Sequence, residues 1–257
     1  MSNFSTKYGP LLIEDQNISK AWSRIVEHIL KNTGTEITPL ILSLTSFDET
    51  GSPLETPGFA EELDKIILRI PNARSIEDVA YTIFPKEVWN ISKNDRHAFF
   101  KTYLKVFNHY KYINLRENRG SYFERLINYG PPENKFNQLE WIITKKNSRK
   151  GVRRSMFQAT IFDPLKDHNG AAQIQFPCMQ NISFEPTKQG LVVNAFYATQ
   201  QLLLKGYGNY LGISRLGAFM AKEMNTTLFK VNIFVGVAKL EKIMKNDVQL
   251  RALLKQA

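Results

Sequence analysis

Apolar residues recur at helical spacing in several separate stretches of the chain. Between Ser19, a candidate N-cap, and Asn32, they form one continuous apolar face that includes Trp22. Similar spacing predicts helices over residues 59–70, 76–84, 94–112, 122–129 and 137–144. The aromatic stripe of the 94–112 helix could stack nucleic-acid bases, but such spacing is more typical of a packed core.

Short apolar and alternating runs predict the strands. They cover residues 39–44, 155–162, 179–186, 191–197 and 229–235, and the third and fourth of these are joined by a turn as a hairpin. We expect a long helix from Gly206, a cationic helix over 240–255, and a poorly anchored arm over 1–17. Because hairpins and long helices lie outside any regular βαβ alternation, the pattern predicts one α+β domain over residues 1–257.

Composition supports a globular protein. The chain has 257 residues, of which 43% are hydrophobic and 12% aromatic, and this is enough to build a sizeable core. A single cysteine allows no intrachain disulfide, and no secretory leader is recognisable, so we expect a reducing, cytoplasmic setting. No apolar run reaches the length of about 18 residues that a membrane span needs. We therefore expect no membrane partner.

The formal net charge of +10 favours anionic partners. Six cations fall within ten positions, and they are Lys145, Lys146, Arg149, Lys150, Arg153 and Arg154. Such a run can bind nucleic acid, or it can be a solvated loop, and composition leaves both interpretations open.

The motifs exclude several kinds of site. The chain has no GxxxxGK[ST] and no GxGxxG after a strand, which argues against nucleotide folds of those types. Its four histidines and one cysteine show no metal-ligand spacing, so no metal is expected. What remains is Cys178 downstream of the Arg153-Arg154 pair. Arginines bind phosphate and nearby cations favour a thiolate, so Cys178 could attack an electron-poor ring carbon of a phosphorylated ligand. The alternative is that Cys178 is a small buried hydrophobe.

The order of these segments resembles the thymidylate synthase family over residues 137–241. The resemblance rests on the run from Val152 to Ser155 with its arginine pair, on Pro177-Cys178, and on Asn209 in a glycine-flanked turn. Gly190 and Tyr197 fit the family's hairpin, and Gly236 fits the glycine of its last motif.

This resemblance implies a large mixed sheet flanked by helices, with the sheets of two copies packed back to back in a homodimer. It implies that Cys178 adds to carbon 6 of a pyrimidine nucleotide and that Asn209 reads the edge of the base. Arg153 and Arg154 would hold the phosphate bound in the other subunit. A methyl or hydroxymethyl unit, donated by 5,10-methylenetetrahydrofolate, would then be transferred to carbon 5.

The chain also departs from the family pattern. Residues 198–202 replace an Arg-Ser-x-Asp sequence, and Val237, Lys239 and Glu241 replace the aspartate, histidine and tyrosine of the last motif. The family's folate-closing tail is not recognisable after residue 249, and Glu87 is only a guess for the general base. Two hypotheses follow. One is an active thymidylate synthase-like transferase, and the other is a catalytically decayed relative that binds a nucleotide or nucleic acid through the basic loop.

Overall fold

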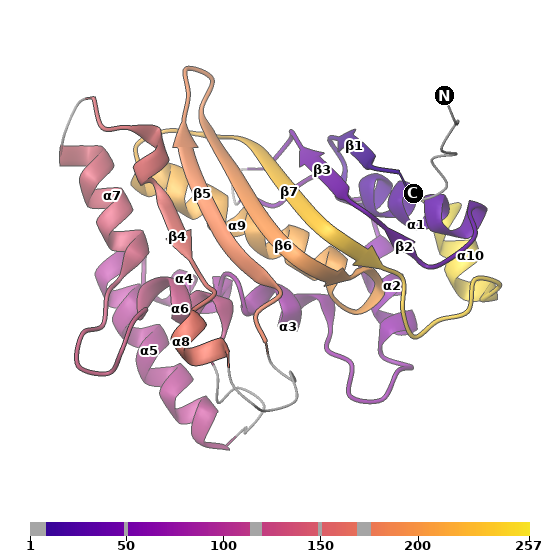
Figure 1. Ribbon diagram of the computed structural model, residues 1–257, viewed down its shortest axis with the longest axis horizontal. Coiled ribbons are helices and arrows are strands. Elements are labelled where there is room, and N and C mark those ends of the chain that lie inside the picture. Colours follow the sequence, from indigo (N-terminus) through magenta and orange to yellow (C-terminus); the bar gives the residue numbers. More distant parts are fainter. Residues whose placement is uncertain (1–8, 49–50, 114–119, 149–150, 169–175) are drawn as a thin grey trace.

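The centre of the molecule is a mixed seven-stranded sheet. The computed structural model describes residues 9–48, 51–113, 120–148, 151–168 and 176–257. The strands run in the order β1 (Leu11–Asp15), β3 (Leu40–Leu44), β7 (Leu228–Lys239), β6 (Leu191–Gln201), β5 (Met179–Pro186) and β4 (Gln158–Thr160), and β2 (Glu36–Ile37) also pairs with β7 (Figure 1). The β1–β3 and β6–β7 pairs are parallel and the others antiparallel. The α+β class predicted from the sequence is confirmed.

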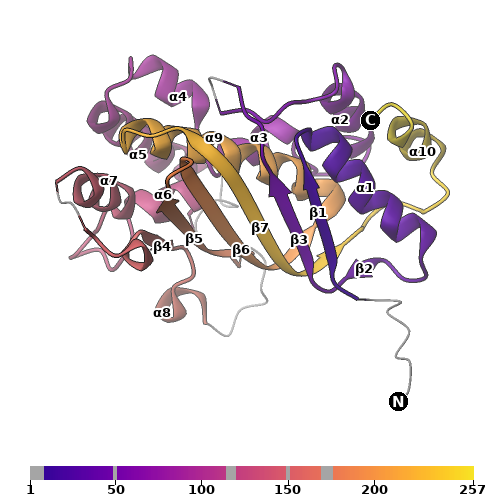
Figure 2. The same ribbon diagram turned by 90° about the horizontal axis from the view of Figure 1, so that it is seen from above.

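Helices flank this sheet, and most of them lie on one side of it (Figure 2). They are α1 (Ile18–Lys31), α2 (Phe59–Ile67), α3 (Ile76–Tyr81), α4 (Lys86–Ile91), α5 (Arg96–Ile113), α6 (Tyr122–Ile127), α7 (Gln138–Ser148), α8 (Pro164–Asp167), α9 (Tyr207–Glu223) and α10 (Val248–Leu254). In the described part of the chain, no helix combines the length and the apolar character needed to cross a membrane. The aromatic stripe of α5 is mainly core, because Phe99, Tyr103 and Phe107 are buried.

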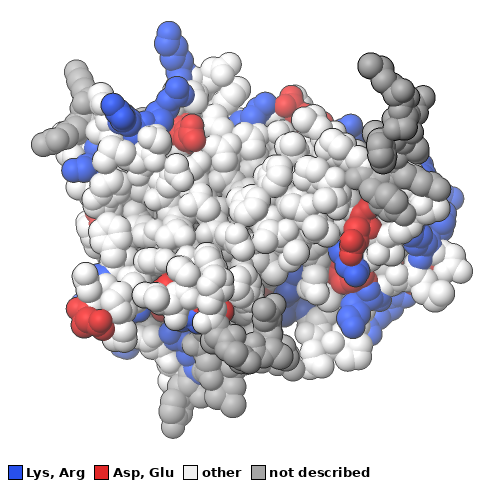
Figure 3. Space-filling view, viewed as in Figure 1, with Lys and Arg blue, Asp and Glu red and all other residues white. Residues whose placement is uncertain are grey.

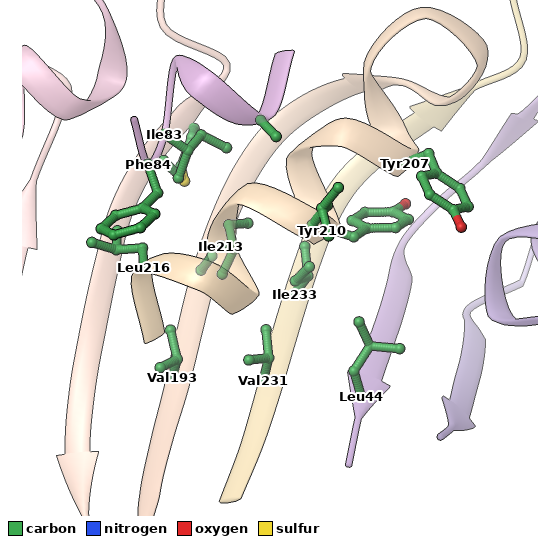
Figure 4. Close-up of a cluster of buried hydrophobic side chains, with 14 of the residues drawn as sticks. Leu44, Ile83, Phe84, Val193, Tyr207, Tyr210, Ile213, Leu216, Val231 and Ile233 are labelled. Atoms are coloured by element: carbon green, nitrogen blue, oxygen red, sulfur yellow. The ribbon is translucent and has the colours of Figure 1, made fainter. Parts of the chain in front are cut away.

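Helix α9 lies between the sheet and α3. Its residues Ile213 and Leu216 belong to the buried cluster that also contains Val193 and Val231 from the strands (Figure 4). On its other side, α9 touches α3 closely at Gly208, where a Cβ atom would lie 2.6 Å from the Ile76 carbonyl oxygen. A glycine is required there because a larger residue would force the two helices apart.

Several predicted boundaries were wrong. Residues 11–15 were expected in a loose arm, but they form β1, which pairs in parallel with β3. The expected helix over 240–255 is limited to α10, and the strand over 155–162 shrinks to β4 after a 3₁₀ turn. The cap of α1 is Asn17, whose side chain accepts a hydrogen bond from the Lys20 N–H. Ser19 is instead buried and its hydroxyl lies 2.9 Å from that of Tyr207.

The buried side of β6 and β7 changes near the end of both strands. Buried residues alternate in β6 as far as Tyr197 and resume at Gln200, and in β7 they alternate as far as Val235 and resume at Ala238. A strict period of two would place Gln200 on the opposite face of the sheet from Tyr197. Because the buried positions of β6 move on by one residue after Tyr197, the side chain of Gln200 is buried instead of that of Thr199.

The face of the sheet that most helices leave open carries few charges at its centre (Figure 3). Phe196 and Phe234 stack on it with ring centroids 5.5 Å apart, and both remain more than a third exposed. A chain of side-chain hydrogen bonds crosses the sheet from Ser43 through Asn232 and Asn194 to Ser183. The centre of this open face is therefore poor in charge, partly aromatic and internally hydrogen-bonded.

Candidate functional site

A cavity of about 640 Å³ lies where β5 begins and β6 ends. Its lining includes one thiol, three cations and three amides, namely Cys178, Arg74, Arg125, Lys205, Gln200, Gln201 and Asn209. Among the described residues, no aspartate or glutamate lines it. The cavity therefore suits an anionic ligand that also has polar groups for the amides to read.

Cys178 is half-buried and is held at the start of β5 by backbone pairing. Its carbonyl oxygen accepts a hydrogen bond of 3.1 Å from the Ala198 N–H on β6. The Thr199 hydroxyl lies 3.8 Å from the Cys178 sulfur, at a distance where it can donate to that sulfur.

Two neutral phenols lie near the thiol. Burial raises the pKa of Tyr122, and the charge of a Cys178 thiolate raises it further. Burial also raises the pKa of Tyr197, with smaller contributions from Tyr122 and Cys178. The Tyr197 hydroxyl is buried and meets no hydrogen-bond partner within the described ranges. Both phenols therefore remain protonated at physiological pH and add no negative charge to the site.

Arg125 is a firmly positioned cation of the cavity wall. It extends from α6, where its guanidinium donates to Asp167 over 2.7 and 2.8 Å and to the Ile161 carbonyl oxygen over 2.9 Å. Burial alone would raise the pKa of Asp167, but hydrogen bonds from Arg125 and from the Asp163 N–H lower it below its ordinary value. This bidentate pair fixes the guanidinium at the cavity wall.

The two buried amides come from different elements. Asn209 lies in the first turn of α9 and is 4% exposed, and Gln200 lies near the end of β6 and is 3% exposed. The Tyr210 hydroxyl donates to the Gln200 Oε1 atom over 2.7 Å. Because α9 packs against β6, residues nine positions apart in sequence face the same cavity.

The structure separates the predicted site residues into two groups. Cys178 and Asn209 line the same cavity. Arg153 and Arg154 are exposed and do not line it; Arg154 lines a second cavity of about 650 Å³ with Lys146. Lys145 lies over the Trp141 ring at 5.7 Å, and Arg149 and Lys150 fall outside the described residues.

Glu87, the guess for a general base, is exposed on α4 and is not among the residues that line the Cys178 cavity.

Three cations that line the cavity were not predicted from the sequence. Arg74 precedes the capping serine of α3, and Lys205 lies in the π-helical turn Leu202–Gly206. The one sequence signal for Arg125 was a cation inside an apolar helix, which requires a partner when buried. No group of three or more potential metal ligands is found in the described part of the chain.

Comparison with known proteins gives one partial similarity. No family model matches the chain. Over 109 residues the chain is 28% identical to a protein of Methanocaldococcus jannaschii named "Putative thymidylate synthase". This alignment covers 40% of the chain and 46% of that protein, so it spans less than half of either. The similarity weakly supports a thymidylate synthase-like relationship.

Proposed function

We propose that this chain is a thymidylate synthase-like transferase that binds a pyrimidine nucleotide in the Cys178 cavity and modifies carbon 5 of its ring with a methyl or hydroxymethyl unit. The observation that carries the proposal is the presence of Cys178 and Asn209 in one cavity with three cations. Cys178 is the nucleophile, Asn209 reads the base, and the cations balance the phosphate.

The chemistry begins with the Cys178 thiolate. It adds to carbon 6 of the ring, and the electron pair of the 5,6 double bond moves to carbon 5 and onto the carbonyl at carbon 4. Carbon 5 then bonds to a one-carbon electrophile at the oxidation level of formaldehyde, whose oxygen becomes the hydroxyl of a hydroxymethyl group. Loss of the carbon 5 proton to a base re-forms the double bond and expels the thiolate. A methyl product would need, in addition, a hydride donor that replaces this hydroxyl, and a reduced folate would supply that hydride. Nearby cations stabilise the enolate, because it carries negative charge.

The described residues do not provide a site for a folate donor. No carboxylate among the described lining residues is available to accept hydrogen bonds from the N–H edge of a pterin. The end of the chain also lies elsewhere, because α10 contacts α2 and buries Leu250, Leu253 and Leu254. 5,10-Methylenetetrahydrofolate therefore stays a prediction, and no step is derived through it.

A homodimer through the open sheet face forms part of the proposal. The centre of that face is poor in charge and presents Phe196 and Phe234, which favours burial against a second copy (Figure 3). Arg153 and Arg154 are exposed and lie away from the Cys178 cavity of their own chain. They are therefore available to contact the phosphate of a nucleotide bound by the partner.

A second candidate function is nucleotide binding without turnover. The specific observation that favours it is the lack of a carboxylate among the described lining residues, because proton removal from carbon 5 needs a base. Nucleic-acid binding through Lys145, Lys146, Arg149 and Lys150 is a further version of this function. It would show the steep salt dependence of phosphate contacts.

Covalent trapping tests the proposal. The whole protein is incubated with a 5-fluoropyrimidine nucleotide, with and without 5,10-methylenetetrahydrofolate, and its intact mass is measured. We expect a mass increase by one nucleotide, plus the mass of the folate where it is present, and Cys178→Ser should abolish it. An adduct that survives this substitution, or no adduct in either condition, would refute the transferase. Nucleotide binding without any adduct would support the second candidate.

A further inference from the structure

Gln200 has a buried amide group that is only half satisfied. Its Oε1 atom accepts the hydrogen bond from Tyr210, whereas its Nε2 atom is buried and meets no acceptor among the described residues. The side chain nevertheless lines the Cys178 cavity. A buried N–H donor without an acceptor is costly, and native structures seldom keep one without a reason.

Tyr210 fixes which end of this amide faces the ligand. Burial raises the pKa of Tyr210, so its hydroxyl keeps its proton throughout the physiological range. The O–H needs an acceptor, and the Gln200 Oε1 atom supplies it at 2.7 Å. Turning the amide over would point N–H groups at the phenol and remove that acceptor. The pair therefore fixes the orientation of the amide and leaves its Nε2 atom as an unsatisfied donor on a residue of the cavity lining.

Gln200 lines the same cavity as Cys178 and Asn209, the two residues assigned to the pyrimidine ring. Its neighbour Thr199 lies 3.8 Å from the Cys178 sulfur, and its partner Tyr210 directly follows Asn209 in α9. Gln200 is neutral, whereas Arg74 and Lys205 bring positive charge to the same cavity for a phosphate. Both facts favour contact with the ring over contact with the phosphate.

From this arrangement, and resting on the proposed function, we propose that the Tyr210–Gln200 pair determines base specificity by presenting a fixed N–H donor to the pyrimidine ring. A 4-oxo ring offers a carbonyl acceptor to this donor, whereas a 4-amino ring offers an amine that also donates. The site therefore selects a uracil-type nucleotide over a cytosine-type nucleotide. The sequence pattern hides this role, because a strict alternation in β6 places Gln200 on the other face of the sheet.

Equilibrium binding of two probes tests the inference. Dissociation constants for deoxyuridine and deoxycytidine monophosphates are measured by calorimetry for the whole protein and its variants. We expect the wild type to bind the uracil nucleotide at least about 10-fold more tightly, the effect of one buried donor left without an acceptor. Gln200→Glu should reverse the preference, because a carboxylate accepts from the amino group and repels the carbonyl. Tyr210→Phe should bring the ratio close to one, because the amide can then turn over.

The control is Gln189→Glu, which adds the same charge at the exposed turn between β5 and β6 and should leave the ratio unchanged. Thermal melting checks that every variant is folded, and Tyr210→Phe gives a test that adds no charge. If the wild type binds the uracil nucleotide but both site variants keep its ratio, the inference is wrong and the proposed function stands. If the wild type binds neither nucleotide, both are overturned.

Discussion

The ion pair between Arg125 and Asp167 gives a quantitative test of how the cavity wall is built. The Arg125 side chain is 5% exposed and that of Asp167 is fully buried. Asp167→Asn keeps the shape of the side chain but removes its charge, which leaves the guanidinium buried without a counter-charge. Breaking a buried pair in this way costs about 3–5 kcal/mol of unfolding free energy. That is a large fraction of the total stability of a domain, which is about 5–15 kcal/mol.

The expected change in melting temperature follows from the length of the chain. An unfolding entropy of about 2.1 cal/mol/K per residue over 257 residues gives about 0.54 kcal/mol/K. The loss of about 3–5 kcal/mol in unfolding free energy therefore corresponds to a fall of about 6–9 °C in the melting temperature. Urea unfolding followed by circular dichroism measures the free energy, and a thermal scan measures the temperature. A control is Lys31→Gln in the exposed pair with Glu27, which should cost about 0.5 kcal/mol or less.

Two further measurements separate a charge effect from a packing effect. The double variant Arg125→Met/Asp167→Leu should recover most of the loss, because neither buried charge remains. The pKa of Asp167 is lowered in the folded state, so its contribution is complete above the unfolded pKa of about 3.9 and is lost as the pH falls through the folded value. The difference between wild type and Asp167→Asn should therefore shrink in acid below about pH 4. A loss of less than about 1 kcal/mol at neutral pH would contradict the reasoning.

Two other substitutions test the packing around the site. Gly208→Ala should destabilise the protein in urea unfolding, because its Cβ would lie 2.6 Å from the Ile76 carbonyl oxygen and 2.7 Å from the Val79 Cβ. The overpacking cost of about 1–3 kcal/mol exceeds the gain of up to about 1 kcal/mol in helix propensity, and a more stable variant would show that α3 can move freely. Tyr197→Phe should be neutral or stabilising by up to about 1 kcal/mol, because the lost hydroxyl is buried without a described partner. A clear loss of stability in the same assay would reveal a partner outside the described ranges.

The sequence predicted those parts of the fold that depend on local periodicity. Most helices of the first half and the β5–β6 hairpin were found because their apolar spacing lies within one segment, whereas the short helix α4 was missed. β1 was missed because its five residues gain their order from pairing with β3. Cys178 was selected as the single cysteine downstream of an arginine pair and Asn209 through a family resemblance, and the structure places both in one cavity. Arg125 could not be identified, because its partner Asp167 lies 42 positions away and only the fold brings them together. Gln200 was not identified, because a strict alternation along β6 predicts that its side chain lies on the opposite face of the sheet from Tyr197.

The sheet topology has a consequence for how the chain reaches its native state. β3 pairs with β7, and Leu40 lies opposite Val235, so the middle of the sheet joins segments from opposite ends of the sequence. Such non-local pairing delays completion of the sheet, because a long loop must close before the contacts form. On the ribosome, β1 and β3 would be made first and would wait for β7 with an unpaired edge. Any variant or truncation that removes β7 is therefore expected to leave two apolar strand edges open and to aggregate.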